Sequence, residues 1–286
     1  MEEFVYLNGE LIPVSQAKIS VMDYGFLYGY GLFETMRAYS GKVFRMDDHL
    51  ERLSLSAEII GIRVDIPEIK YAVSETIKAN QLSEARVRVT VSIGEGEMVP
   101  NPGACSEPTV LVVAGSYHPY PEDVYKRGFR AIISSTRRNS QSGLSRLKSA
   151  NYLASMLARQ EARAAGVDEA ICLNEKGLVA EASMSNIFSV TDGMLKTPGE
   201  DSGILPGITR NVVLELTGRL NIKVLEQDIK PEEFFQAQEV FLTNSLMEIM
   251  PLVELDGKQI ESGKPGELTQ RLMTGYKETV IKEVGE

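Results

Sequence analysis

The chain is organised around the stretch Gly143-Leu144-Ser145-Arg146-Leu147-Lys148-Ser149-Ala150-Asn151-Tyr152-Leu153, with Lys148 at its centre. Upstream, residues 130–134 predict a buried β-strand, and the polar segment 137–143 predicts a loop. Downstream, apolar residues recur at helical spacing until Gly166 ends the run. The pattern therefore places Lys148 where a loop meets the start of a helix.

A lysine in that position has a particular chemistry. The positive end of the helix dipole opposes the ammonium form and favours the neutral amine. The neutral amine is the form that attacks a carbonyl to make a Schiff base. Most lysines before helices are simply solvated, so a catalytic role for Lys148 needs support from the rest of the chain.

Composition limits the classes of function. The 286 residues are 43% hydrophobic and 24% charged, which is typical of one large globular domain or two smaller ones. A formal charge of -10 argues against nucleic acid or an anionic membrane as the main partner. With two cysteines and two histidines, a disulfide framework or a zinc site is not expected. The sequence begins without a signal-peptide pattern, so we expect a cytoplasmic protein.

The first third of the sequence predicts a sheet with helices. Residues 4–13 predict a hairpin with an Asn-Gly turn, and a second hairpin is expected around Ser40-Gly41. Between them, residues 23–35 alternate glycines with aromatic residues, which suits a packed turn or a close approach to a ligand. The strict alternation of 86–93 places Arg86, Arg88 and Thr90 on one face of a strand, where the arginines either face water or await an anion.

The middle of the chain contains the best candidate for a domain boundary. Tyr117-His118-Pro119-Tyr120-Pro121-Glu122 has the composition of a linker. We therefore expect a small N-terminal domain at 1–117, a linker at 118–127 and a large domain at 128–286 that carries Lys148.

Two features of the second half are candidates for ligand binding. Glu181 ends a predicted strand, where its carboxylate could point into a cleft or into solvent. Residues 201–210 form a glycine-flanked loop in which Thr209 opens a helix. Free N–H groups and a hydroxyl at a helix start suit a phosphate, although a helix N-cap is the commoner role for such a threonine.

These segments, in this order, resemble the fold-type IV pyridoxal-phosphate enzymes, the class IV aminotransferase family. The resemblance covers nearly the whole chain. It is carried by six motifs, at 28–34, His49-Leu50-Glu51-Arg52-Leu53, Arg146-Leu147-Lys148-Ser149, 179–188, 203–210 and Thr243-Asn244-Ser245. It implies an α/β (α+β) fold of two domains, like D-amino acid aminotransferase, with pyridoxal 5'-phosphate between them, in a homodimer.

The resemblance also implies roles for individual residues. Lys148 would bind the cofactor and then move protons, while Glu181 would bond the pyridinium nitrogen. Tyr152 would reach the phenolic oxygen of the cofactor. The phosphate would be held by Arg52, Ile208, Thr209 and Ser245. The substrate side would be lined by Tyr28, Phe33, Thr35, Arg86, Arg88, Asn244, Leu246 and Met247.

The branch of the family is a separate question. Relative to the branched-chain aminotransferases, Lys148 and Tyr152 are one residue closer, Arg86 stands in place of a tyrosine, and Asn244-Ser245 replaces a Gly-Thr pair. We expect an aminotransferase that moves an amino group between an amino acid, of either hand, and a 2-oxo acid such as 2-oxoglutarate or pyruvate. The alternative is a 4-amino-4-deoxychorismate lyase that releases 4-aminobenzoate and pyruvate, a branch that Thr35 and Asn244 resemble.

Overall fold

The structure is a computed structural model that describes residues 3–105 and 107–285. Its Cα atoms divide into two compact units. The first runs to His118 and includes Leu147–Asn151 and the end of the last helix from Ile281. The second consists of Pro119–Arg146 and Tyr152–Val280. Within the described part of the chain, no helix is long and apolar enough to cross a membrane.

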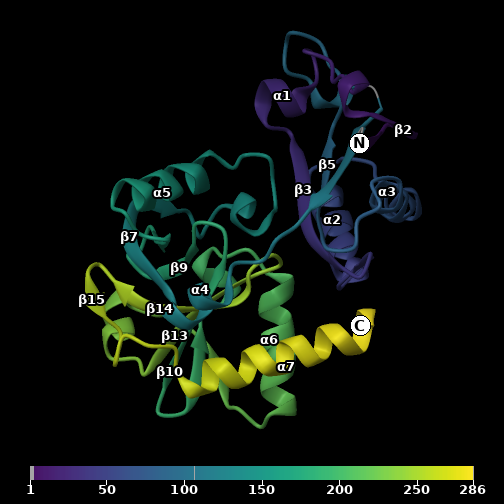
Figure 1. Ribbon diagram of the computed structural model, residues 1–286. Helices are drawn as coiled ribbons and strands as arrows, with labels where there is room; N and C mark the ends of the chain where they lie inside the picture. The colour runs from purple at the N-terminus through teal and green to yellow at the C-terminus, as the bar shows by residue number, and fades with distance from the viewer. Residues whose placement is uncertain (1–2, 106, 286) are drawn as a thin grey trace. The chain divides into compact units, whose positions relative to one another are not determined.

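The first unit is built on a six-stranded antiparallel sheet in the order β2-β1-β6-β5-β3-β4. Helices α2 and α3 pack on one face (Figure 1), where the apolar side chains of the strands are buried against them. The elements are β1 Phe4–Leu7, β2 Glu10–Pro13, α1 Tyr24–Tyr28, β3 Gly31–Tyr39, β4 Lys42–Val43, α2 Met46–Ile59, α3 Ile66–Ala79, β5 Ala85–Ser92 and β6 Thr109–Ser116.

Local patterns in this unit are confirmed. Asn8 and Gly9 both have positive φ, as a tight hairpin turn requires, and so do Ser40 and Gly41. In β5 the valines are buried whereas Arg86 is exposed and Arg88 is half-buried. The arginine-bearing face of β5 is therefore the face opposite α2 and α3.

The second unit is built on a nine-stranded mixed sheet in the order β12-β11-β10-β13-β14-β7-β8-β9, with β15 paired to β14. Helix α5 packs on β7 and β8 through alanines that meet Ala170 and Cys172. The elements are α4 Glu122–Arg127, β7 Phe129–Arg138, α5 Leu153–Ala164, β8 Glu169–Asn174, β9 Val179–Ala182, β10 Asn186–Thr191, β11 Met194–Thr197, α6 Ile208–Arg219, β12 Val224–Glu226, β13 Glu239–Asn244, β14 Glu248–Leu255, β15 Lys258–Gln259 and α7 Glu267–Val284.

The two units differ from the predicted domain limits in two places. Residues 122–127, expected to belong to a linker, form helix α4. The segment around Lys148, expected in the large domain, belongs to the first unit, because it pairs with β3: the Phe33 N–H donates to the Lys148 carbonyl at 2.9 Å and the Ala150 N–H to the Gly31 carbonyl at 2.8 Å.

The predicted position of Lys148 at a helix start is wrong. Helix α5 begins at Leu153, and Lys148 precedes it in an extended segment whose neighbour Ser149 bridges Leu32. The effect of a helix dipole is largely limited to its first turn. The dipole therefore does not explain how the amine of Lys148 would be kept neutral.

Candidate active site

In the first unit, Lys148 is held against one residue of β3. Besides the backbone bond to Phe33, its Nζ lies 4.7 Å from the centroid of the Phe33 ring. The guanidinium of Arg88 lies 3.8 Å from the centroid of the same ring. Since Thr35 faces Arg88 in the β3–β5 register, the structure brings together Lys148, Phe33, Arg88 and Thr35.

Arg52 lies on α2, on the helix-covered side of the sheet, and is fixed by Glu34. Its Nε and Nη2 donate to the two carboxylate oxygens of Glu34 at 2.8 and 2.6 Å. His49 Nδ1 adds a third bond to Glu34 at 2.7 Å. All three side chains are largely buried, with 1% of the Glu34 side chain, 2% of His49 and 11% of Arg52 exposed. This pairing gives the guanidinium a single orientation.

The protonation of this network follows from its charges. Burial alone would raise the pKa of Glu34, but the charge of Arg52 and the hydrogen bonds from His49 and Arg52 outweigh it and lower the pKa to about 2. Burial, with the charges of Arg52 and Lys148, lowers the pKa of His49 below its usual value even though Glu34 opposes the shift. At neutral pH Glu34 is therefore ionised, His49 is neutral, and the Nδ1–H of His49 donates to Glu34.

Two other predicted substrate residues of this unit lie elsewhere on it. The Tyr28 hydroxyl donates to the Met98 carbonyl at 3.3 Å, and its ring packs edge-on against Tyr24. Arg86 is exposed and faces Arg37 across the strand pair. The structure thus holds Arg88 beside Lys148, whereas Arg86 lies two residues farther along β5.

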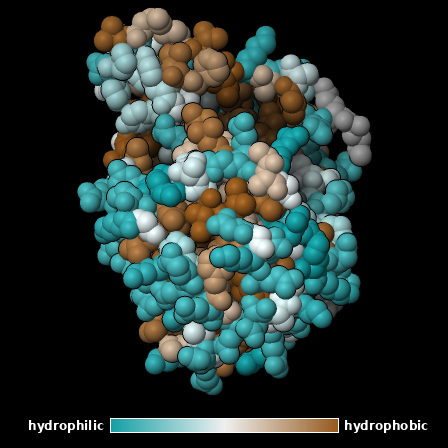
Figure 2. Space-filling view, turned by 90° about the vertical axis from the view of Figure 1, so that its left-hand side faces the viewer, coloured by the Kyte–Doolittle hydropathy of each residue, from teal (hydrophilic) through white to brown (hydrophobic). Residues whose placement is uncertain are grey.

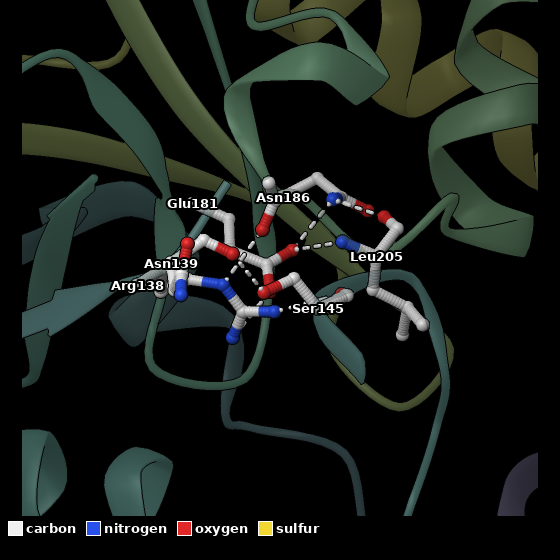
Figure 3. Close-up of polar contacts among 7 residues, drawn as sticks. Arg138, Asn139, Ser145, Glu181, Asn186 and Leu205 are labelled. Carbon is white, nitrogen blue, oxygen red and sulfur yellow. Dashed lines mark hydrogen bonds and ion pairs between the residues drawn. The ribbon is translucent and has the colours of Figure 1, made fainter. Parts of the chain in front are cut away.

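In the second unit, Glu181 is the centre of a polar network that joins four segments (Figure 3). Its carboxylate accepts hydrogen bonds from Asn186 Nδ2 at 3.0 Å and the Leu205 N–H at 3.1 Å, and pairs with Arg138 Nη1 at 3.0 Å. Arg138 also donates to the carbonyls of Gly203 and Ser145 at 2.8 and 2.9 Å. Glu181 is 6% exposed, so these donors fix a buried carboxylate.

Asn186 links Glu181 to the other predicted cofactor residues of this unit. Its Nδ2 also donates to the Leu205 carbonyl at 2.8 Å, in the loop that leads into α6. It faces Thr243 in the β10–β13 register, one residue before Asn244 and two before Ser245. The N-terminus of α6 and the end of β13 are therefore both tied to Asn186.

The predicted threonine at the start of α6 is not an N-cap. Gly207 occupies the cap position, and Thr209 is the second residue of the helix and is buried. The first N–H groups of a helix, here those of Ile208 and Thr209, have no partner within the helix. Since this terminus also carries the positive end of the dipole, it suits a phosphate.

The turn after β13 is held by Asn244. Its Oδ1 accepts the N–H groups of Leu246 and Met247 at 3.0 and 2.9 Å. Met247 is buried, and Ser245 and Leu246 are half-buried. Asn244 therefore shapes the turn that carries Ser245, Leu246 and Met247.

Tyr152 belongs to the second unit and stands immediately before α5. Burial is the main reason that its pKa is raised, to about 12, and the charges of Glu181 and Glu169 add to the effect. The phenol is therefore protonated throughout the neutral range and acts as a hydrogen-bond donor.

Comparisons with known proteins establish the family. The model of the class IV amino-transferases matches residues 31–255. The provisionally named branched-chain-amino-acid aminotransferase of Methanocaldococcus jannaschii is 40% identical over 97% of this chain and 96% of that protein. The crystal structure of the Escherichia coli branched-chain amino acid aminotransferase matches with a TM-score of 0.93, 33% identity and coverage of 97% of this chain and 94% of that chain. The crystal structure of a further branched-chain amino acid aminotransferase, with pyridoxamine 5'-phosphate bound, matches with a TM-score of 0.92 and 31% identity, over 97% and 94% of the two chains.

The chain belongs to the class IV aminotransferase family, whose cofactor is pyridoxal 5'-phosphate. This confirms the recognised family, the predicted fold class and the predicted cofactor. The fold and the aminotransferase class are those of the branched-chain enzymes among its relatives.

Two observations in the second unit fit this cofactor. Within the described chain, the hydroxyls of Ser185 and Thr243 are buried and have no hydrogen-bond partner, which is costly unless a ligand supplies one. At Gly207, a Cβ atom would lie 2.0 Å from Asn186 Oδ1, so only glycine leaves the helix start this close to Asn186.

The residues that sequence reasoning left without a role are Arg138, Asn186, Glu34 and His49. Asn186, Glu34 and His49 stand inside the recognised motifs, so their positions were a usable signal. Arg138 is the last residue of a strand and meets Glu181 only through the fold of the second unit. No local pattern identifies it.

The close approach at Gly207 gives a prediction. Gly207→Ala should displace the Asn186 side chain and break its bonds to Glu181 and Leu205, so we expect pyridoxal phosphate to bind about five- to a hundredfold more weakly. Titration of the cofactor-free protein, followed by absorbance, measures this. Gly218→Ala on the same helix is the control, because nothing lies within 4 Å of its Cβ position. Equal affinities in the two variants would contradict the prediction.

Proposed function

We propose that this protein is a transaminase that moves an amino group between an amino acid and a 2-oxo acid, with branched-chain amino acids as the first donors to test and 2-oxoglutarate as the acceptor. The observation that carries the proposal is the anchoring of Lys148 on β3, in a chain whose relatives share its whole length and are named for this reaction.

When bound, pyridoxal phosphate supplies a carbonyl that captures the amino group and a ring that stabilises negative charge. Lys148 binds the carbonyl carbon, then removes the proton from the substrate Cα and returns a proton on the other side of the transfer. Glu181, held by its three donors, accepts a hydrogen bond from the ring nitrogen and keeps the proton there.

The phosphate is assigned to donors of complementary kinds. Arg52 contributes a guanidinium fixed by Glu34, Ile208 and Thr209 contribute the N–H groups of a helix start, and Ser245 contributes a hydroxyl. Tyr152 donates to the phenolic oxygen of the ring. Phe33, Thr35 and Arg88, and on other segments Tyr28, Arg86, Asn244, Leu246 and Met247, are assigned to the substrate.

A dicarboxylic acceptor is supported by the arginines of β5. Arg86 and Arg88 project from the face of the sheet that α2 and α3 do not cover, and Arg88 lies within reach of the Phe33 ring that Lys148 also contacts. Guanidinium groups recognise carboxylates through paired hydrogen bonds. A second carboxylate on the 2-oxo acid would give these residues a partner.

The decisive experiment is a half-reaction. The purified protein is mixed with a panel of L- and D-amino acids, and the absorbance of the cofactor is followed as it changes from its aldehyde to its amine form. Conversion by L-leucine, L-valine or L-isoleucine, reversed by 2-oxoglutarate, would support the proposal. Conversion by D-amino acids alone would reassign the stereochemistry. No conversion, together with release of 4-aminobenzoate and pyruvate from aminodeoxychorismate, would reassign the protein as the lyase.

The raised pKa of Tyr152 gives a prediction about pH. Since that pKa is about 12, Tyr152 keeps its proton between about pH 6 and 10 and contributes no limb to the activity profile there. Tyr152→Phe should therefore lower activity by a factor that is the same at every pH in this range. The measurement is the ratio of wild-type to variant kcat/KM across the range. A ratio that changes tenfold with pH would show that the phenol titrates.

A homodimer is also proposed, on the basis of an exposed apolar surface. Around α1, large hydrophobic side chains are exposed, among them Val21, Phe26 and Met98, at 72 to 76%. Figure 2 shows hydrophobic residues gathered on the part of the surface where α1 lies in Figure 1. A hollow of about 300 Å³ lies among them. Such patches are typical of interfaces, so we expect sedimentation analysis to give twice the mass of the chain.

A further inference from the structure

Arg88 is held in place by the first unit itself. Its Nε donates to Thr90 Oγ1 at 3.2 Å, two residues along the same strand. Its guanidinium carbon lies 3.8 Å from the centroid of the Phe33 ring, on the neighbouring strand. Arg88 is half-buried, whereas Arg86 on the same face of β5 is exposed. The charge of Arg88 is therefore fixed on the surface of β3 and β5.

Lys148 approaches the same aromatic ring. Its Nζ lies 4.7 Å from the centroid of Phe33. The two cationic groups are consequently at most 8.5 Å apart, the sum of 4.7 and 3.8 Å. Two positive charges this close, and partly shielded from water, disfavour each other. Arginine stays charged at every accessible pH, so the lysine is the group that responds.

We propose that Arg88 is a positioning residue for Lys148, whose fixed positive charge disfavours protonation of the Lys148 amine and keeps more of it in the neutral, nucleophilic form. This function would be served by Arg88 in addition to any contact with substrate. It replaces the helix dipole, which the position of Lys148 rules out as the cause. Its significance rests on the proposed role of Lys148 as the cofactor lysine.

The other charged groups that surround Lys148 in this unit do not produce the same effect. On α2, the charge of Arg52 is largely offset by its partner Glu34, and His49 is neutral near pH 7. The Phe33 ring acts in the opposite direction, since an aromatic face favours a cation. Arg86 is exposed and two residues farther along the strand, so solvent and salt screen it more.

The size of the effect follows from the distance. At 8.5 Å, with an effective dielectric constant between about 20 and 80, the repulsion changes the ratio of neutral to protonated lysine by about two- to thirtyfold. Below the midpoint of its titration, the reactivity of a lysine is proportional to its neutral fraction. Removal of Arg88 should therefore slow the reaction of Lys148 by this factor at a fixed pH.

The experiment reads the titration of Lys148 directly. The full-length chain without cofactor is labelled with a trace of acetic anhydride between about pH 6 and 10.5, and the extent of acetylation at Lys148 is measured by mass spectrometry of its peptide. Arg88→Gln should move the midpoint of the Lys148 profile to higher pH. Arg88→Lys, which retains a cation, should leave the midpoint near that of the wild type. Arg86→Gln, the matched control on the same strand, should do the same.

Three results would overturn the proposal. The first is an unchanged midpoint in Arg88→Gln, and the second is an equal shift in Arg86→Gln, which would indicate only net charge. The third is an equal shift in Arg88→Lys, which would indicate lost packing on Phe33. Arg88→Met retains the apolar stem and provides the charge-free variant if Arg88→Gln does not fold. Because acetylation does not involve the cofactor, the result is independent of whether the proposed transamination is observed.

Discussion

Lys148→Ala should lose both the visible absorbance of the attached cofactor and the transaminase activity. Without its amine, no side chain remains at the end of the β3-paired segment to bind the cofactor carbonyl or to move the proton at the substrate Cα. Positioned proton transfer alone contributes about a hundred- to ten-thousandfold to a rate, so we expect kcat to fall by at least a thousandfold. Absorbance of the purified variant and steady-state rates with the best donor measure the two losses.

The fold should survive this substitution. The bonds that hold the segment to β3 use the backbone of Lys148, not its side chain, so the melting temperature should change little. Lys176→Ala, in the exposed turn between β8 and β9, is the matched control and should keep both colour and activity. Retention of the wild-type absorbance in Lys148→Ala would show that another lysine holds the cofactor.

The elements that the sequence predicts well are those set by local physical chemistry. The Asn8-Gly9 turn follows from backbone conformations that few residues adopt, and the alternation of β5 follows from the two-residue period of a strand. The last helix, expected from about Glu267 to Val284, has those limits in the structure. In each case neighbours in the sequence carry the information.

The region around Lys148 shows where such reasoning fails. Ser149, Ala150 and Asn151 are compatible with an early helix start, but their backbone groups pair with β3 instead, and α5 begins at Leu153. Pairing with a strand more than a hundred positions earlier leaves no local pattern in the sequence. The motif therefore identified Lys148 as a candidate, while the physical reason offered for its reactivity was wrong.

The candidate site shows the same division between residue identity and residue environment. The recognised motifs placed Arg52 and Glu181 among the cofactor residues, and these assignments remain proposals. Which groups orient them depends on packing: β3 against α2 brings Glu34 to Arg52, and the end of β7 brings Arg138 to Glu181. A sequence without the fold could not supply those partners.

Glu34→Gln should be the most destabilising conservative substitution in the first unit. Glutamine matches the shape of glutamate but leaves the buried guanidinium of Arg52 without its counter-charge. Removal of one member of a buried ion pair costs about 3–5 kcal/mol in the free energy of unfolding. Urea unfolding at pH 7 measures the loss. Glu84→Gln is the matched control, because Glu84 pairs with Arg37 at 3.4 Å but is 44% exposed, so its loss should cost less than about 1 kcal/mol.

The pH dependence of this difference tests the cause. The pKa of Glu34 is about 2 in the folded protein, against an ordinary value of 4.5, so its ionisation stabilises the fold fully above pH 4.5, and that stabilisation is lost as pH falls toward 2. The shift corresponds to about 3 kcal/mol. Because protonated glutamate resembles glutamine, wild type and Glu34→Gln should converge in stability as pH falls below 4.5. A gap that stays constant between about pH 7 and 3 would mean that shape, not charge, is what the variant has lost.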